Sequence, residues 1–204
     1  MLKKTLVSSL LVTSLFYVAP SIAQEQETAK PSVIYNISGN LPNLKFSLTA
    51  SEGRTLTEQD VKGKVVVLFF GYASCPDICP TTMAQLSMVK NMLENDADKV
   101  QIIFLSVDPH RDTPEVLQAY VDAFDNGAIG LTGTEKEIAD IARRYRVAYQ
   151  IEKPKANDPN NYEVMHAKGI YIFDAKGKVQ FLASDSQEPE ALLAKIQTIL
   201  PSST

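Results

Sequence analysis

Two continuous apolar segments dominate the pattern of hydrophobic and polar positions along this chain. Residues 64–70 (KVVVLFF) and 100–107 (VQIIFLSV) are rich in β-branched and aromatic side chains. Such runs are typical of strands that are buried on both faces of a sheet. Between them, residues 80–94 carry apolar side chains at every third or fourth position, which is the period of an amphipathic helix. The pattern therefore predicts a strand, a helix and a second strand in succession.

The rest of the pattern predicts further helices and shorter strands. Helices are expected over 114–124, 134–145 and 187–200, and strands over 46–49, 128–131, 170–174 and 178–183. Thr113 and Pro114 suit the start of one helix, and Thr134 with Glu137 forms a capping box for the next. The last two strands read as a β-hairpin. This order predicts an α/β protein with a thioredoxin-like fold, in which a central mixed sheet is flanked by helices and followed by a C-terminal hairpin and helix.

The N-terminal segment has the layout of a secretory signal peptide. Lys3 and Lys4 stand near the initiator methionine, an apolar run covers 6–19, and the small residues Ser21 and Ala23 stand at the positions that a signal peptidase reads. The run is shorter than the about 20 residues that span a membrane. We expect cleavage after Ala23 and a periplasmic location, with an uncleaved membrane anchor as the alternative. The predicted divisions are a signal peptide at 1–23, a mobile lead-in at 24–40 and the folded domain at 41–204.

Charge and cysteine content narrow the range of functions. The formal net charge is −4 and no Lys/Arg cluster is present, which argues against a nucleic-acid partner. We expect a monomer that meets the membrane only if its N-terminal segment stays uncleaved. The two cysteines, Cys75 and Cys79, are too close in sequence for a disulfide between them to remove much chain entropy. The pair is therefore better placed for chemistry than for structural cross-linking.

The cysteine pair lies between the first buried strand and the helix that follows it. Backbone N–H groups and the dipole of a helix start favour a thiolate, which is both a nucleophile and a soft metal ligand. Three residues separate Cys75 from Cys79, whereas the dithiol oxidoreductase motif has two. Residues at this spacing face the same way on a helix, so their sulfurs can close a disulfide or hold a metal. A permanent disulfide, or two inert buried thiols, is the alternative interpretation.

A metal ion held by the two sulfurs would need at least one further protein ligand. Two sulfurs do not complete a closed zinc site, whereas two thiolates and one imidazole suit copper. The chain has two histidines, His110 after the second buried strand and His166 before the strand at 170–174. Both loops can reach the cysteine end of the sheet, and the hydrophobic pattern does not choose between them.

Three segments resemble the Sco/SenC family of copper proteins. They are GYASCPDICPTTMAQL at 71–86, SVDPHRDTPEVLQAY at 106–120 and YEVMHAKGIYIFDAKGKV at 162–179. The resemblance implies a thioredoxin-like fold and a copper site formed by Cys75, Cys79 and His166. It also implies a role in supplying copper to the dinuclear copper site of cytochrome c oxidase, or in reducing the cysteines of that site.

The chain departs from the family pattern beside the histidine. Typical members have Asp before it and Ser or Thr after it, and here these positions are Met165 and Ala167. A thioether is a candidate soft ligand. Adjacent residues of an extended segment point to opposite sides, however, so we expect Met165 and His166 not to face one ion.

Other polar residues near the motifs have more ordinary interpretations. We expect His110 to be an exposed loop residue, and Asp108, Arg111 and Asp112 to hold their loop together through charge-assisted hydrogen bonds. Asp77 either tunes the thiolates or contacts a partner, or it is a helix-start carboxylate with no further role.

Two functional hypotheses follow. In the first, the protein is a copper chaperone and not a conventional enzyme. It holds copper with Cys75, Cys79 and His166 and passes it by ligand exchange to a copper-receiving partner. The partner that the resemblance implies is the copper subunit of cytochrome c oxidase. In the alternative hypothesis, the same cysteines act as a thiol–disulfide oxidoreductase, with Cys75 as the attacking thiolate.

Overall fold

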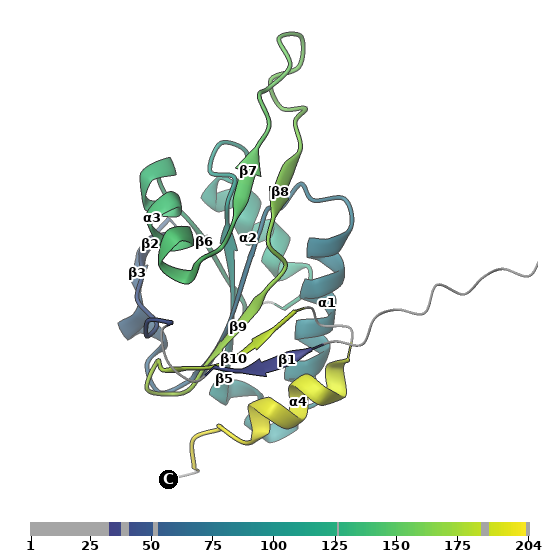
Figure 1. Ribbon diagram of the computed structural model, residues 1–204. Coiled ribbons are helices and arrows are strands. Elements are labelled where there is room, and N and C mark those ends of the chain that lie inside the picture. Colours follow the sequence, from purple (N-terminus) through teal and green to yellow (C-terminus); the bar gives the residue numbers. More distant parts are fainter. Residues whose placement is uncertain (1–32, 38–40, 51–52, 126, 185–187, 203–204) are drawn as a thin grey trace, which may run out of the picture. The chain divides into compact units, whose positions relative to one another are not determined.

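The two apolar segments form the central strands of a mixed sheet. In the computed structural model, β4 (Val65–Gly71) and β5 (Val100–Ser106) pair in parallel, and every residue of both strands is buried. Their register runs from Val65 opposite Val100 to Gly71 opposite Ser106. The carboxyl ends of both strands therefore lie side by side, so the segments that follow them start from the same edge of the sheet (Figure 1).

The structure describes residues 33–37, 41–50, 53–125, 127–184 and 188–202. All of them belong to the unit Pro31–Thr204. The predicted signal peptide, its cleavage site and most of the predicted lead-in lie outside these residues. No helix in the described part of the chain is long and apolar enough to span a membrane.

Within the described residues, eight strands form the main sheet in the order β1-β10-β9-β4-β5-β6-β2-β3. The β4–β5 and β5–β6 pairs are parallel, and the other neighbours are antiparallel. The remaining strands are β1 (Ile34–Asn36), β2 (Ser47–Ala50), β3 (Thr55–Thr57), β6 (Ile129–Thr132), β9 (Ile170–Phe173) and β10 (Val179–Ala183). The predicted C-terminal hairpin is the β9–β10 pair.

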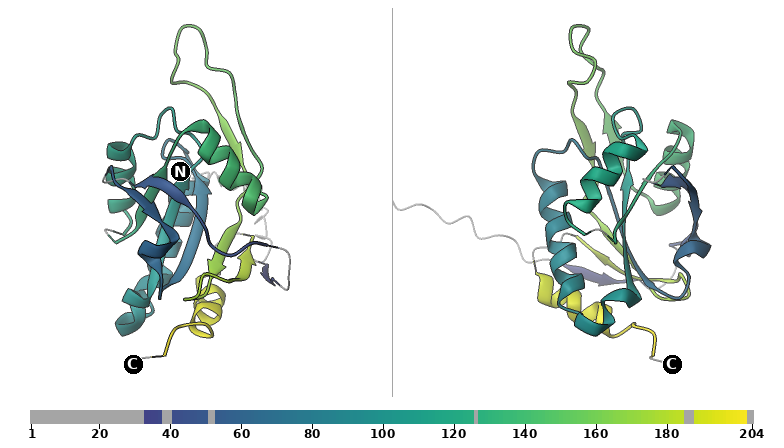
Figure 2. Two further views of the ribbon diagram at one scale, coloured as in Figure 1. Left: turned by 90° about the vertical axis from the view of Figure 1, so that its left-hand side faces the viewer. Right: turned by 180° about the vertical axis from the view of Figure 1, so that it is seen from behind.

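Helices cover both faces of this sheet. The two crossover helices are α1 (Ile78–Asn91) and α2 (Pro114–Asp122), which lie on one face, while α3 (Glu135–Tyr145) lies on the other (Figure 2). The C-terminal helix α4 (Pro189–Gln197) packs against α1. Two short 3₁₀ helices cover Glu58–Val61 and Glu94–Lys99. This arrangement confirms the predicted thioredoxin-like fold.

The caps of the helices agree with the sequence analysis. Thr113 accepts a hydrogen bond from the backbone N–H of Val116, and Pro114 is the first residue of α2. Thr134 and Glu137 form the predicted capping box of α3. Thus two of the helix starts are set by local side-chain chemistry, independently of the sheet.

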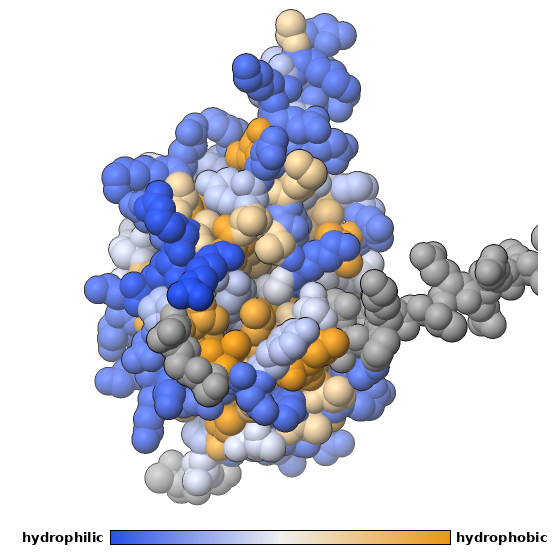
Figure 3. Space-filling model, in the orientation of Figure 1, coloured by the Kyte–Doolittle hydropathy of each residue, from blue (hydrophilic) through white to orange (hydrophobic). Residues whose placement is uncertain are grey.

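Three features of the fold were not predicted. Strand β3 pairs with β2 and follows it closely in the chain, but the sequence analysis gave no strand there. Strand β1 lies within residues 24–40, which the sequence analysis assigned to a lead-in, and it pairs with β10 at the edge of the sheet. Strands β7 (Tyr149–Ile151) and β8 (Val164–His166) form a separate two-stranded ribbon. All four of these strands are three residues long, so no apolar run or sustained alternation marks them. The ribbon projects beyond the main sheet, and its far end has a largely hydrophilic surface (Figures 1 and 3).

Candidate metal centre

The cysteine half of the site is built where β4 ends and α1 begins. A turn follows the strand, in which the backbone N–H of Cys75 donates to the carbonyl oxygen of Tyr72 over 3.2 Å. Helix α1 starts at Ile78, so Cys79 is helical and Cys75 is not. The helix therefore begins two residues earlier than the predicted range of 80–94, and the two cysteines do not share a helix face, because it does not include Cys75. The turn brings its sulfur towards Cys79 instead.

Gly71, the last residue of β4, leaves room for the Cys79 sulfur. A Cβ atom at this position would lie 2.7 Å from the Phe104 ring and 2.9 Å from Cys79 Sγ. Contacts this short force the neighbouring atoms to move. Because Phe104 and Cys79 are both fully buried, neither has free space to move into. The absence of a side chain at position 71 thus lets the end of the strand pack directly against the thiol.

The two free thiols differ in burial and acidity. Cys79 is fully buried, and burial raises the pKa of its thiol well above the ordinary value. Cys75 is partly exposed, and burial opposes its ionisation as well. Hydrogen bonds from the backbone at Asp77 and Cys79, and from the side chains of Cys79 and Tyr72, nevertheless outweigh that burial and lower the pKa of its thiol. Cys75 is therefore the thiol that ionises more readily.

His166 supplies the other half of the site from the end of β8. Its Nε2 lies 3.3 Å from Cys79 Sγ, and its Nδ1 lies 3.0 Å from the carbonyl oxygen of Ala167. Because a carbonyl oxygen only accepts hydrogen bonds, Nδ1 carries the proton and Nε2 offers its lone pair to the site. Burial lowers the pKa of His166, which keeps the imidazole neutral at pH 7.

Aromatic rings fix the position of this imidazole. The rings of Phe69 and Tyr72 meet it edge-on, with centroid separations of 6.1 Å and 5.9 Å. Both aromatic residues come from the segment that carries the cysteines, at the end of β4 and just after it. The histidine therefore packs against the cysteine half of the site as well as facing its sulfur.

The three residues named by the sequence analysis meet in space. One ligand atom from each of Cys75, Cys79 and His166 lies within 4.8 Å of the other two. Two sulfurs and one neutral imidazole nitrogen form a soft donor set, which suits copper and falls short of the four ligands of a closed zinc site. The structure thus places His166 beside the cysteines and His110 beside Glu135, an arrangement that the hydrophobic pattern left open.

The other candidates lie outside this group. The His110 side chain is 58% exposed, and its Nε2 lies 3.0 Å from Glu135 Oε1, as expected for a solvated loop residue. Met165 is 57% exposed and precedes His166 in an extended strand, so the two side chains point to opposite sides. Asp77 makes no side-chain capping hydrogen bond to α1, which leaves its predicted roles open.

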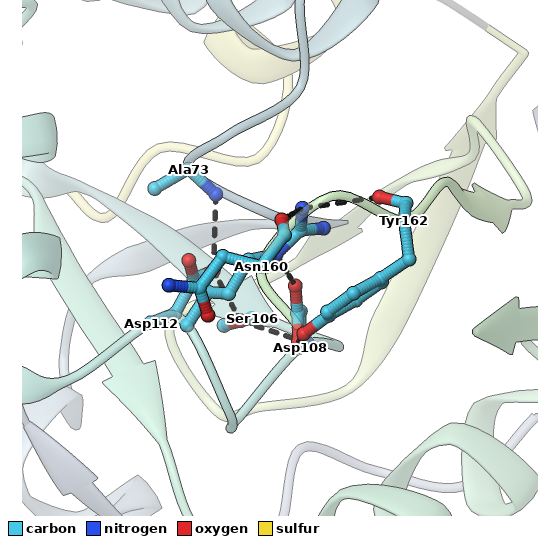
Figure 4. Close-up of polar contacts among 7 residues, drawn as sticks. Ala73, Ser106, Asp108, Asp112, Asn160 and Tyr162 are labelled. Atoms are coloured by element: carbon cyan, nitrogen blue, oxygen red, sulfur yellow. Dashed lines mark hydrogen bonds and ion pairs between the residues drawn. The ribbon is translucent and has the colours of Figure 1, made fainter. Parts of the chain in front are cut away.

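The loop after β5 contains the predicted hydrogen bonds, but these extend further than expected. Arg111 Nε pairs with Asp108 Oδ2 at 2.5 Å, and the Asp112 carboxylate accepts a hydrogen bond from Ser106 Oγ at 2.5 Å. The same side chains also reach the cysteine segment at Ala73 and the ribbon at Tyr162 (Figure 4). The sequence analysis missed these contacts because the partners lie far from the loop along the chain.

The fold and the three converging ligands define a thioredoxin-like protein with a Cys–Cys–His metal centre. The chain belongs to the SCO1/SenC family, which matches residues 38–201. It is 35% identical over 154 residues to the mitochondrial protein SCO2 of Saccharomyces cerevisiae, covering 74% of this chain and 50% of that protein. The chain thus spans half the length of this relative.

Solved structures agree with this assignment. Bradyrhizobium japonicum ScoI with copper bound shares 37% identity at a TM-score of 0.68, covering 78% of this chain and 99% of that one. Yeast Sco1 with copper bound shares 30% identity at a TM-score of 0.67, covering 79% of this chain and 92% of that one. The predicted family is confirmed. Copper, the predicted cofactor, agrees with the donor set found here and with these two copper-bound relatives.

Proposed function

We propose that this protein is a copper chaperone that binds one copper ion through Cys75 Sγ, Cys79 Sγ and His166 Nε2. The observation that carries the proposal is the convergence of these three ligand atoms within 4.8 Å. The readily ionised Cys75 thiol and the neutral imidazole are in the forms that bind a metal, and Cys79 gives up its proton on binding.

The site suits transfer as well as binding. Three protein ligands leave copper open to a further donor, so an incoming thiolate from a partner can bind before a chaperone ligand departs. Cys75 is the sulfur that a partner can reach, because it is partly exposed while Cys79 is buried. Ligand exchange beginning at Cys75 would move the ion without releasing it to solvent.

The receiving protein in this proposal is the copper subunit of cytochrome c oxidase, or a similar respiratory oxidase. The family relationship and the sequence resemblance support a role in assembling its copper site. The signal-peptide pattern of residues 1–23 supports export to the periplasm, either as a cleaved protein or with the segment kept as a membrane anchor. We expect the chaperone to work as a monomer.

A copper titration of the reduced protein tests the ligand set. We expect one copper per chain, with thiolate-to-Cu(II) charge-transfer absorption. Binding should be lost in Cys75→Ser and Cys79→Ser and weakened in His166→Ala. The matched control is His110→Ala, which removes the other histidine and should leave the titration unchanged. A His166→Ala variant with full copper affinity would falsify the assigned ligands.

Transfer is tested separately from binding. Copper-loaded protein is mixed with the metal-free, reduced copper-binding domain of the oxidase subunit, and the metal content of each is measured after separation. The chaperone proposal expects copper to move to the oxidase domain. If copper stays on the chaperone under all redox conditions, delivery to this partner is wrong even though binding stands.

A thiol–disulfide oxidoreductase is the second candidate, and the unequal thiols favour it. The Cys75 thiolate would attack a partner disulfide, releasing one partner thiolate and forming a mixed disulfide. Cys79 would then displace the second partner thiol, which leaves the partner reduced and this protein with a Cys75–Cys79 disulfide. Such activity requires both cysteines and no metal. Reduction of the oxidase domain that persists in His166→Ala would favour this function over copper delivery.

A further inference from the structure

The loop over residues 106–112, which follows β5, touches both halves of the metal centre. We infer that this loop is a clamp that holds the imidazole of His166 against the two thiols, with Arg111 as its main positioning residue. The inference rests on the proposed copper-binding function, because it explains how the third ligand is kept in place. It assigns a role in metal binding to residues that are not themselves ligands.

The clamp holds the histidine half through the segment that leads into β8. Arg111 Nη1 donates hydrogen bonds to the carbonyl oxygens of Asn160 (3.1 Å) and Tyr162 (3.0 Å). The guanidinium also lies over the Tyr162 ring, with its carbon 3.8 Å from the ring centroid. In addition, the Tyr162 hydroxyl donates to Asp108 Oδ1 over 2.7 Å (Figure 4). Tyr162 stands four residues before His166, so these contacts fix the approach of the strand that carries the ligand.

The clamp holds the cysteine half through the turn after β4. Asp112 Oδ2 accepts a hydrogen bond from the backbone N–H of Ala73 at 3.0 Å, two residues before Cys75. On the same side, the guanidinium carbon of Arg111 lies 5.5 Å from the centroid of the Tyr72 ring. Arg111 is therefore near aromatic rings from both halves of the site, Tyr72 from one and Tyr162 from the other.

Burial makes this network more than a set of surface contacts. Asp108 and Asp112 are fully buried, and the Arg111 side chain is 13% exposed. Charged groups in such surroundings need their partners, so the network favours one arrangement of the loop. Planar guanidinium also donates in several fixed directions at once, which a lysine ammonium does not reproduce.

The ribbon of β7 and β8 is not part of the main sheet, so other contacts must hold it in position. In the described part of the chain, β7 and β8 pair with each other and with no strand of the main sheet. Ladder hydrogen bonds therefore do not connect the His166 strand to the strand that leads to the cysteines. The chain joins the main sheet four residues after His166, where Ile170 of β9 pairs with Phe69 of β4. Before His166, the contacts of the 106–112 loop hold the segment that leads into β8.

A double-mutant cycle separates positioning from general stability. Arg111→Lys keeps the positive charge but removes the planar guanidinium and its several hydrogen-bond donors. Loss of a group that orients a metal ligand typically lowers metal affinity by about 10- to 100-fold. We expect a loss of about tenfold in copper affinity when His166 is present, and less than about twofold when it is replaced by Ala. The matched control is Arg143→Lys, because Arg143 pairs with Asp140 at the same i,i+3 spacing but is 74% exposed. It should leave copper affinity unchanged in both backgrounds.

A second readout needs no metal. In the metal-free protein, the nuclear Overhauser effect between the His166 and Tyr72 rings reports their separation, and it should weaken in Arg111→Lys and in Tyr162→Phe but not in Arg143→Lys. Tyr162→Phe removes one hydroxyl and carries the test alone if Arg111→Lys does not fold. Equal copper losses with and without His166, or an unchanged ring contact, would overturn the clamp. Failure of the wild-type protein to bind copper would instead contradict the proposed function. The ring contact in the metal-free protein would still show whether the loop positions His166.

Discussion

The cysteine and histidine halves of the metal centre are built in different ways. The cysteine half is part of the hydrophobic core, because β4 is buried along its whole length and Cys79 is fully buried. The histidine half lies on a ribbon outside the main sheet, next to an exposed Met165. The first is thus fixed by packing, and the second by a small number of polar and aromatic contacts over long sequence distances. A change in the first half should therefore destabilise the fold more than a change in the second, whose main effect should be on the site.

The largest expected effect is that of Gly71→Ala. The added methyl group would press on Phe104 and Cys79, and overpacking of a filled core costs about 1–3 kcal/mol. Urea denaturation of the reduced, metal-free protein measures this loss. The control is Gly127→Ala, whose Cβ would meet only the ends of the Lys90 and Asp125 side chains. Equal stability losses in the two variants would contradict a tightly packed cysteine half.

A smaller loss of stability is expected from His166→Ala. The substitution removes ring contacts with Phe69 and Tyr72, and an aromatic pair contributes about 0.5–1.5 kcal/mol beyond its buried area. The same urea experiment should therefore place this variant between Gly127→Ala and Gly71→Ala. A loss as large as that of Gly71→Ala would show that the ribbon is part of the core, which would remove the contrast between the two halves.

The two thiols should react differently with pH. Because the pKa of Cys75 is lowered, its thiolate forms, and its alkylation accelerates, at lower pH than for an ordinary cysteine. Tyr72→Phe removes a hydrogen bond to this sulfur and should move the midpoint of the rate profile upwards. Cys79, buried and with a raised pKa, should stay unmodified in the native protein. Mass spectrometry after timed alkylation distinguishes the sites, and equal rates at both would contradict the described asymmetry.

The smallest effect is expected at Met165. Because its side chain is 57% exposed and points away from the side of β8 that carries His166, Met165→Leu should leave Cu(I) affinity unchanged. Competition with a Cu(I) chelator measures this affinity. A tenfold loss would make the thioether a ligand and would require the ribbon to turn on binding copper.

The contrast between the halves also explains what the sequence could predict. The cysteine half was accessible, because an apolar run, a glycine and a cysteine pair at a helix start are neighbours in sequence and their signals are local. The start of α1 was placed two residues too late, so the fact that Cys79 is part of the helix was missed. Such a boundary depends on the turn at Tyr72, which no hydrophobic period reports.

The histidine half was accessible only through the family resemblance. Strands β7 and β8 have three residues each, too few to show a period, and His110 and His166 have similar loop surroundings in the sequence. The polar loop was predicted to be held by hydrogen bonds of Asp108, Arg111 and Asp112, and the structure contains hydrogen bonds of all three side chains. Its contacts with Tyr162 and Ala73 depend on tertiary packing, and the hydrophobic pattern carries no signal for them.

The complete burial of Cys79 makes the two sulfurs of the site unequally accessible. Protein atoms cover that sulfur on the side of the core, and Cys75 stands at the surface. In the proposed transfer, an incoming thiolate would meet the ion from the solvent side, where Cys75 would be the donor most easily displaced. The unequal burial of the two sulfurs would then set the order of release, with Cys75 leaving the ion before Cys79.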